Sequence, residues 1–250
     1  MKKATDAQIK KELEIMEELK KIDTPTITNA VATYPGDQEN CLGLYDPWAC
    51  DWYTDQTLRC MYPEIGPVVG YAVTCVYGMP DATYQRRHNI VDVAEAIAAS
   101  PKPVILAVKQ NFPEKIKNKN GLLGGNMMTT FQTAGAVGVL TDGPSRDVDE
   151  IRPFGIQYML TGVTAGHGTF ALQAVNVPVE ICGMAVQTGD IIHMDENGAV
   201  KFPREYLEEV LIRSKRILAK EKKMQEAIRS SKGDPEIIRS VFAGTYGKKK

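Results

Sequence analysis

The residues best suited to chemistry stand together at 141–147, TDGPSRD, directly after a run of apolar residues. In open α/β sheets, ligands bind beyond the carboxyl ends of the strands. Arg146 can hold a carboxylate or another oxyanion through its planar fork of donors. Asp147 can supply an oxygen ligand to Mg²⁺, which usually takes one or two protein carboxylates and keeps several waters. The pair therefore indicates a site for an anionic substrate beside a metal ion.

A purely structural interpretation of this pair stands beside the functional one. Glu150 follows Asp147 by three residues, so the two can form a box-like cap on the next helix. Arg146 can then be an ordinary surface ion-pair partner. The spacing alone leaves both interpretations open.

A glycine-rich loop at 121–126 leads into a helix predicted to begin at Met127. Free N–H groups at a helix start bind anions such as carboxylates. The loop matches neither GxGxxG nor the P-loop, so a plain turn is the alternative. His167, between two glycines, is a candidate pocket residue, with a structural histidine as the alternative.

Composition excludes several classes of protein. The 250 residues carry 30 Lys and Arg against 31 Asp and Glu, which lacks the basic excess of a nucleic-acid binder. No apolar run approaches the roughly 20 residues of a membrane span, and no secretory signal is expected. The five cysteines form no CxxC pair, so neither a disulfide framework nor a zinc site is expected. A reducing, cytoplasmic location follows. We expect no nucleic-acid partner and no membrane association.

The apolar pattern predicts the elements that must position these residues. Short Val-rich runs at 68–76, 104–108 and 136–141 predict buried strands, with helical stretches at 90–100 and 127–134 between them. This alternation predicts an α/β fold with a largely parallel sheet. A short helix to about residue 154 and smaller strands at 156–160, 177–181, 190–193 and 199–202 are expected to follow.

Helices are predicted towards both ends of the chain. An amphipathic pattern covers 6–21, and Thr24 with Pro25 predicts a capped helix over 26–31. Residues 34–63 are expected to form a long loop or an inserted hairpin. Pro203 opens a last helix to about residue 228, where Glu221 continues the apolar face. Either Glu221 has a partner on this packing face, or the helix has already left the core there and Glu221 is exposed to solvent. The predicted division is an N-terminal helix (1–22), an α/β domain (23–203) and a C-terminal helix and tail (204–250).

Several motifs in order resemble the RraA-like family, which includes the 4-hydroxy-4-methyl-2-oxoglutarate / 4-carboxy-4-hydroxy-2-oxoadipate aldolases. They are GGNMMTT at 124–130, GVLTDG at 138–143 and Arg146-Asp147, within a similarity that spans about residues 20–230. The resemblance implies an RraA-like swivelling β/β/α domain, here with extra N- and C-terminal helices. It also implies a homotrimer or a dimer of trimers with active sites between subunits.

The resemblance implies a divalent-metal-dependent carbon–carbon lyase acting on a 2-oxo acid. The reaction would be retro-aldol cleavage of a 4-hydroxy-2-oxo acid to pyruvate, oxaloacetate decarboxylation, or both, through a metal-stabilised enolate. Asp147 would hold Mg²⁺ or Mn²⁺, and Glu221 of a neighbouring subunit would act through water. Arg146 would contact the keto oxygen. The substrate carboxylate would bind the loop residues Gly125, Asn126, Met127 and Met128.

One position departs from the aldolases. Asn126 stands where they typically carry an acid that assists the water shell of the metal, and an amide brings no charge. Such changes commonly cost about 10–100-fold in metal affinity or activity. The alternative is a non-catalytic RraA-like regulator that binds another protein. Because those regulators lack the aspartate of the Arg-Asp pair, Asp147 favours an enzyme.

Overall fold

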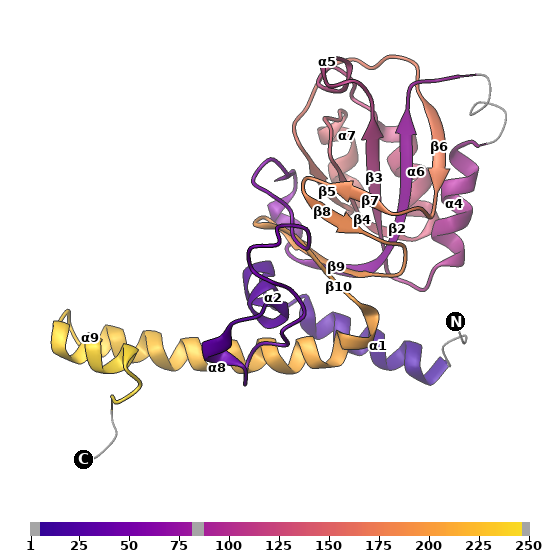
Figure 1. Ribbon diagram of the computed structural model, residues 1–250. Helices are drawn as coiled ribbons and strands as arrows, with labels where there is room; N and C mark the ends of the chain where they lie inside the picture. Colours follow the sequence, from indigo (N-terminus) through magenta and orange to yellow (C-terminus); the bar gives the residue numbers. More distant parts are fainter. Residues whose placement is uncertain (1–5, 82–87, 247–250) are drawn as a thin grey trace.

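The computed structural model describes residues 6–81 and 88–246 (Figure 1). Its centre is a mixed sheet in which β2 pairs with β3, β3 with β4 and β4 with β5, all in parallel. Strands β9 and β6 pair antiparallel with different halves of β2, β10 with β9, and β1 with β5. Strands β7 and β8 form a separate hairpin. The predicted α/β fold with a parallel centre is confirmed.

The strands are β1 (Arg59–Cys60), β2 (Val68–Gly78), β3 (Val104–Asn111), β4 (Ala136–Thr141), β5 (Gln157–Leu160), β6 (Ala171–Val175), β7 (Val179–Ile181), β8 (Met184–Val186), β9 (Ile191–Asp195) and β10 (Gly198–Phe202). The α-helices are α1 (Asp6–Leu19), α2 (Thr24–Val31), α4 (Ile90–Ala99), α5 (Glu114–Lys117), α6 (Gly125–Ala134), α7 (Val148–Ile151), α8 (Leu207–Ser230) and α9 (Pro235–Phe242). Single 3₁₀ turns lie at Pro35–Asp37, Pro63–Ile65, Arg152–Phe154 and Arg204–Tyr206.

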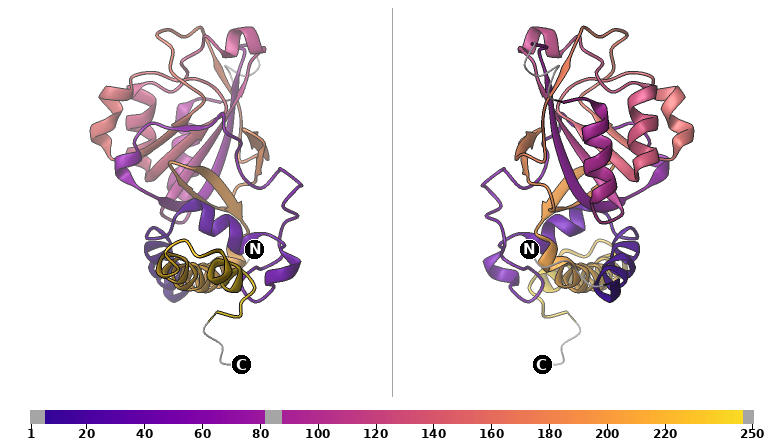
Figure 2. Two further views of the ribbon diagram at one scale, coloured as in Figure 1. Left: turned by 90° about the vertical axis from the view of Figure 1, so that its left-hand side faces the viewer. Right: turned by 90° about the vertical axis from the view of Figure 1, so that its right-hand side faces the viewer.

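The core has a layer on each face of the sheet (Figure 2). On one face, α4 and α6 pack through Ile97 and Phe131 against Val73 and Leu106. On the other face, the β7–β8 hairpin covers residues of β2, β3 and β4. Because successive strand residues point to opposite faces, one short apolar strand supplies both layers.

The terminal helices share a third cluster with the sheet. Met16 and Leu19 of α1 pack with Val69 of β2, Phe202 of β10 and Val210 of α8. His193 of β9 fastens the turn between α1 and α2, because its ring nitrogens lie 2.9 Å from Thr24 Oγ1 and 3.1 Å from Leu19 O. Burial lowers the pKa of this histidine, so it serves the fold as a neutral group. The predicted boundaries after residues 22 and 203 stay predictions.

Several sequence-based boundaries differ from the structure. Asp23, not Thr24, caps α2, since its side chain accepts a hydrogen bond from Thr26 N. Helix α6 begins at Gly125, two residues before the predicted start. The strands β6 and β8 were not predicted, because each is too short to show a clear hydrophobic period. The amphipathic helix α9 was not predicted either, because the residues after about 228 were assigned to a tail. The last helix begins at Leu207 after a 3₁₀ turn.

The remaining expectations about segments agree with the structure. Residues 34–63 are mainly irregular, and all five cysteines are free thiols. Among the described residues, no helix combines the length and the apolar character needed to cross a membrane.

Candidate active site

A polar cavity of about 410 Å³ lies at the carboxyl ends of β3, β4 and β5. It collects residues from three loops that are separate in sequence. Its walls are Leu122, Gly124, Gly125, Asn126, Met127, Arg146, Asp147, Glu150, His167 and Phe170. We call it the head cavity. The structure thus brings the predicted glycine loop and the predicted Arg-Asp pair into one site.

Buried hydrogen bonds hold the loops of this site together. Ser145 Oγ accepts from Leu123 N at 3.1 Å and donates to Leu123 O at 2.6 Å. The Tyr158 hydroxyl contacts both Ser145 Oγ and Leu123 O, which ties β5 to the glycine loop. Gly121 N donates to Gly166 O at 2.9 Å, which joins that loop to the segment carrying His167. Because Ser145, Leu123 and Tyr158 are buried, the hydrogen bonds among them hold the loops of the site rigidly.

Arg146 and Asp147 form an ion pair directly before the N-terminus of α7. The Arg146 Nε lies 3.3 Å from Asp147 Oδ2, and both side chains are about one-third exposed. Asp147 has a left-handed backbone with φ of 59°, an uncommon conformation for a residue other than glycine. Its side chain makes no cap on α7 and accepts from Gly125 N at 3.0 Å. The capping-box interpretation is therefore wrong, because the left-handed turn aims the carboxylate at the glycine loop.

The start of α6 offers two backbone donors to the head cavity. Within the described residues, the backbone N–H groups of Asn126 and Met127 donate no hydrogen bond. The Gly125 amide already binds Asp147, and the Met128 amide donates to Gly124 O at 3.0 Å. Met128 is also fully buried in the core. Of the four residues predicted to bind the carboxylate, Asn126 and Met127 are therefore the two whose backbone amides lack a partner among the described residues, because Met128 is the first residue inside the helical ladder. The binding role of the four residues stays a prediction.

Two glycines leave room for the acidic side chains of the site. A Cβ atom on Gly124 would lie 2.7 Å from Asp147 Oδ2 and 3.1 Å from Arg146 Nε. A Cβ atom on Gly125 would lie 2.0 Å from Glu150 Oε1. Any side chain at 124 would therefore displace the Arg-Asp pair, and one at 125 would displace Glu150.

Glu150 and Phe170 are site residues that the sequence analysis did not identify. Glu150 had been considered only as a capping partner, yet it lines the head cavity beside Gly125. The signal was present, because residues three apart lie on the same side of a helical turn, as Asp147 and Glu150 do. His167 is confirmed as a pocket residue, and its Nδ1 lies 2.9 Å from Gly168 O.

The donor set of the head cavity fits a hard divalent cation. Two carboxylates, Asp147 and Glu150, line it, and no cluster of three or more His, Cys, Asp or Glu ligands occurs within the described residues. Mg²⁺ and Mn²⁺ suit oxygen ligands, and Mg²⁺ is usually held by one or two carboxylates with water and substrate completing its shell. A zinc-type cage would need more nitrogen or sulfur ligands.

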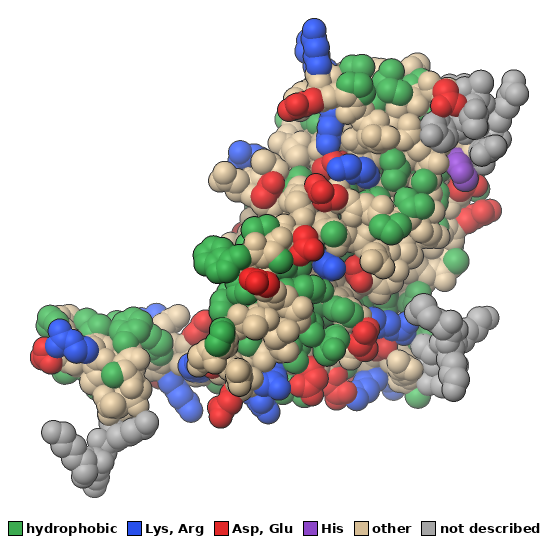
Figure 3. All heavy atoms as spheres, in the orientation of Figure 1, with side chains coloured by type: hydrophobic (Ala, Val, Ile, Leu, Met, Phe, Trp, Pro, Cys, Tyr) green, Lys and Arg blue, Asp and Glu red, His purple; other side chains and the backbone are tan. Residues whose placement is uncertain are grey.

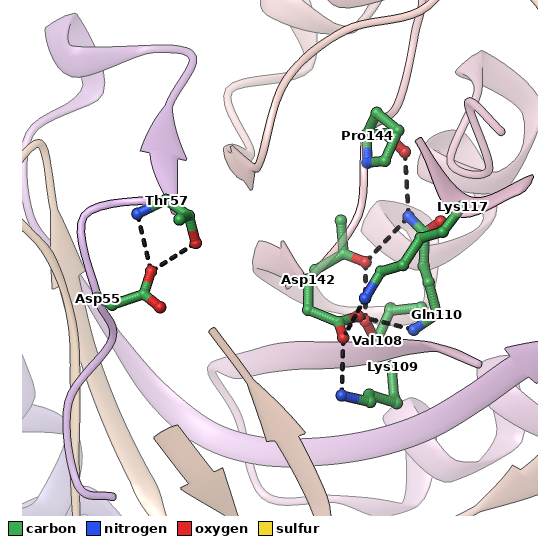
Figure 4. Close-up of polar contacts among 9 residues, drawn as sticks. Asp55, Thr57, Val108, Lys109, Gln110, Lys117, Asp142 and Pro144 are labelled. Atoms are coloured by element: carbon green, nitrogen blue, oxygen red, sulfur yellow. Dashed lines mark hydrogen bonds and ion pairs between the residues drawn. The ribbon is translucent and has the colours of Figure 1, made fainter. Parts of the chain in front are cut away.

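Asp142, the first acid of the predicted motif, lies outside the head cavity in an ion cluster (Figure 4). Its Oδ2 contacts Lys109 Nζ at 2.8 Å and Lys117 Nζ at 2.6 Å, and its Oδ1 accepts from Gln110 N at 2.8 Å. Lys117 belongs to α5, which precedes the glycine loop. Asp142 therefore joins the end of β4 to the approach of that loop.

Glu221 lies elsewhere in the same chain. It lines a different cavity, of about 310 Å³, with Tyr34, Asp37 and Lys220 among its neighbours. The apolar stripe of α8 weakens before this point, since Leu218 is 39% exposed. A single chain therefore does not bring Glu221 to Asp147, and its contribution from a neighbouring subunit stays a prediction.

Comparisons with known proteins agree with this architecture. Residues 44–201 match the sequence profile of the RraA-like family, described as Aldolase/RraA. An uncharacterized protein of Methanocaldococcus jannaschii is 34% identical over 113 residues, which cover 45% of this chain and 54% of that protein. The chain thus matches about half the length of that relative.

Two further comparisons cover more of the partner protein. A putative 4-hydroxy-4-methyl-2-oxoglutarate aldolase of Halorhodospira halophila is 28% identical over 161 residues, covering 62% of this chain and 93% of that protein. The solved structure of a Streptomyces coelicolor protein, described as an unusual member of the RNase ES inhibitor RraA family, aligns with a TM-score of 0.61. That alignment covers 85% of this chain and 96% of the other at 20% identity, so it supports the fold alone.

Proposed function

The chain belongs to the RraA-like family, and we propose that it is a divalent-metal-dependent carbon–carbon lyase that acts on a 2-oxo acid. The family contains proteins named as aldolases and proteins named as RNase inhibitors. The observation that carries the proposal is the head cavity, where Arg146, Asp147 and Glu150 line the same walls as two unpaired amides of α6. This set could hold a divalent cation and an anionic substrate side by side.

The substrate carboxylate is assigned to the amides of Asn126 and Met127. Both belong to the first turn of a ten-residue helix, where unpaired N–H groups and the helix dipole favour an anion. Arg146 would lie beside the 2-oxo oxygen and stabilise the negative charge that develops there. Its Nε is buried and has no hydrogen-bond acceptor in good geometry within the described residues. This nitrogen lies 3.3 Å from Asp147 Oδ2, so the pairing with Asp147 holds the arginine at the cavity wall.

Asp147 and Glu150 would hold Mg²⁺ or Mn²⁺, with water completing the shell. When bound, the cation supplies positive charge next to the oxygens of the 2-oxo acid, which lowers the cost of forming an enolate. Glu150 would compensate for the missing acid at Asn126, because it brings a carboxylate to the same wall of the cavity.

The proposed retro-aldol step breaks the bond between C3 and C4 of a 4-hydroxy-2-oxo acid. The electron pair of that bond passes to C3 and gives the enolate of pyruvate, while C4 becomes a carbonyl. The proton of the 4-hydroxyl must leave to a base, and C3 must later receive one. Glu150 and His167 line the cavity. Each can exchange a proton with the bound substrate, directly or through a water molecule. Loss of CO₂ from oxaloacetate gives the same enolate.

Exchange of the pyruvate methyl protons in D₂O, followed by NMR, tests enolate formation without knowledge of the full substrate. We expect exchange with Mg²⁺ or Mn²⁺ that a chelator abolishes. Arg146→Ala and Asp147→Ala should each reduce it by about 100-fold or more. Asp149→Ala, an exposed acid of α7 outside the cavity, should leave it unchanged. Metal-dependent exchange that survives in Asp147→Ala would exclude the assignment.

A protein-binding regulator is the second candidate, since one fold neighbour is described as a member of an RNase inhibitor family. Asn126 is the residue that favours it, because the site has one acid fewer than the aldolases. A stoichiometric protein partner, together with no metal binding in calorimetry and no exchange, would establish this function in place of the first. We also propose a cytoplasmic location, which the free thiols favour.

A further inference from the structure

A second cavity, of about 370 Å³, adjoins the head cavity. The two share Met127 and Phe170 as walls. Each volume is at the lower end of the range for small-molecule sites. We call the second space the tail cavity.

The tail cavity differs from the head cavity in chemistry. Besides the shared walls, its apolar lining comes from Ile90, Ala171 and Leu172, with Tyr77 at one side. Among the described residues that line it, none is Asp, Glu, Lys or Arg. Of these described residues, His88 is the one that could carry a charge, and it already lies 3.5 Å from Asp92. The described lining therefore suits an uncharged group, because a charged group would lose its hydration without gaining a strong partner from these residues.

Tyr77 contributes the one unpartnered hydroxyl of the described wall, next to the apolar lining. Its side chain is 2% exposed, and its hydroxyl has no hydrogen-bond partner within the described residues. Buried hydroxyls without a partner are uncommon, because each one costs the loss of its bond to water. A molecule in the tail cavity would meet this wall.

We propose that the substrate is a 2-oxo acid with an uncharged, mainly apolar tail, such as an aryl or branched alkyl group, seated in the tail cavity. This inference rests on the proposed function, since it places the 2-oxo acid group in the head cavity. Met127 connects the two parts. Its amide is a donor at the start of α6, and its side chain forms the wall between the cavities. Head and tail are therefore close enough to belong to one molecule.

The first measurement compares three probes by calorimetry on the intact protein with Mn²⁺. Pyruvate has no tail, 2-oxo-4-phenylbutanoate has an apolar tail, and 2-oxoglutarate has a charged one. The phenyl probe should bind about tenfold or more tightly than pyruvate, because burying the ring removes apolar surface from water. An affinity ratio near one would overturn the proposal, as would 2-oxoglutarate binding as tightly as the phenyl probe.

Two matched variants on β6 test whether the phenyl group of the probe lies in the tail cavity. Ala171→Leu extends a side chain into the tail cavity and should reduce the affinity ratio of phenyl probe to pyruvate to about one. Ala174→Leu makes the same change on the same strand outside both cavities and should keep the ratio. A ratio that Ala171→Leu leaves intact would contradict the proposal. Should Ala171→Leu not fold, wild-type NMR decides, since the phenyl protons should show contacts to the methyl group of Ala171 and none to that of Ala174.

The two proposals can fail separately. Absence of metal-dependent pyruvate exchange, with the phenyl preference present and lost in Ala171→Leu, would remove the lyase and keep the tail site. Exchange that depends on Asp147, without any phenyl preference, would keep the lyase and remove the tail site.

Discussion

At the scale of single residues, the site depends on what each polar group is already bound to. Asp147 keeps one carboxylate oxygen on Gly125 N, which orients the side chain towards the head cavity. Its left-handed backbone is the kind of strained conformation that clusters at functional sites. Among the described residues, the backbone amides of Asn126 and Met127 have no partner, whereas that of Met128 donates within the helix.

A variant of Glu150 tests whether this carboxylate takes the place of the acid that the aldolases carry at the position of Asn126. Glu150→Gln keeps the size of the side chain and removes its charge. We expect it to lower metal-dependent pyruvate exchange or metal affinity by about 10–100-fold. Asp149→Asn, one residue earlier and outside the cavity, is the control and should have no effect. Equal activity of Glu150→Gln and wild type would mean that Asp147 suffices.

Two buried tyrosines should respond in opposite ways to loss of the hydroxyl. Tyr77→Phe removes a group without a described partner, so the free energy of unfolding should stay level or rise by up to about 1 kcal/mol. Tyr158→Phe removes hydrogen bonds to Ser145 and Leu123, so the free energy of unfolding should fall by about 1–2 kcal/mol. Urea denaturation measures both. A clear loss in Tyr77→Phe would show that its hydroxyl is satisfied.

At the scale of elements, the site is set by how loops and helices are fastened to the sheet. Parallel strands end at one edge, so the loops after β3, β4 and β5 meet there. Ser145, Tyr158 and the Asp142 cluster then hold these loops in register. Helix α1 is fastened at the opposite side of the molecule by Glu12, which binds Arg204 and Tyr71.

The close approach of Gly124 to the side chains of Arg146 and Asp147 leads to a testable prediction. Gly124 has an extended backbone that any residue can adopt, so Gly124→Ala should fold. Its new methyl group would meet Asp147 Oδ2 and Arg146 Nε, and should lower pyruvate exchange by about tenfold or more. Gly162→Ala adds the same methyl group where nothing lies within 4 Å, and should match wild type. Equal rates in the two variants would place the reacting groups elsewhere.

The fastening of α1 gives a prediction about pH. Burial opposes ionisation of Glu12, but hydrogen bonds from Arg204 and Tyr71 outweigh it and hold the pKa of Glu12 below its usual value of 4.5. The stabilisation is therefore complete above that value and is lost as the pH falls through the lower pKa of the folded state. Glu12→Gln should cost about 1–3 kcal/mol at pH 7 and flatten the acid side of the stability curve.

Thermal unfolding from pH 3 to pH 7 measures this effect, with Glu14→Gln, an exposed acid of the same helix, as the control. An unchanged pH profile in Glu12→Gln would show that the ion pair does not act through ionisation.

At the scale of the whole molecule, α8 extends along one side of the fold, with α9 folded back at its far end (Figures 1 and 2). Hydrophobic side chains gather at this end and near the irregular segment after α2 (Figure 3). Phe242 is 67% exposed and Trp48 is 88% exposed. Large exposed apolar side chains that cluster on a projecting element are typical of interfaces.

The predicted homotrimer or dimer of trimers can be checked on this surface. Light scattering after size exclusion should give three or six chains per particle. Phe242→Asp should lower the assembled fraction, because a charge would be buried without a partner. Circular dichroism should show an unchanged helix content. A monomeric wild-type protein that carries out pyruvate exchange would exclude both the assembly and the role predicted for Glu221.

The pattern of residues along the chain was enough to predict the parts of this protein that depend on near neighbours. The run at 136–141 became β4 with the predicted bounds, and the α/β alternation and the Arg146-Asp147 turn after β4 followed from the same periodicity. Strand and helix periods arise from hydrogen bonding and burial over a few neighbouring residues, so they are readable along the chain. The charge balance also predicts no nucleic-acid partner, and this stays a prediction.

Which side chains share a cavity became known from the folded chain alone. It placed Glu150 and His167 beside the predicted glycine loop, kept Asp142 out, and gave Glu221 a separate neighbourhood. It also revealed the tail cavity, whose walls Tyr77, Met127 and Phe170 come from three distant elements. Spacing cannot predict such contacts, because they depend on where separate loops meet at the edge of the sheet and on which polar groups are already satisfied there.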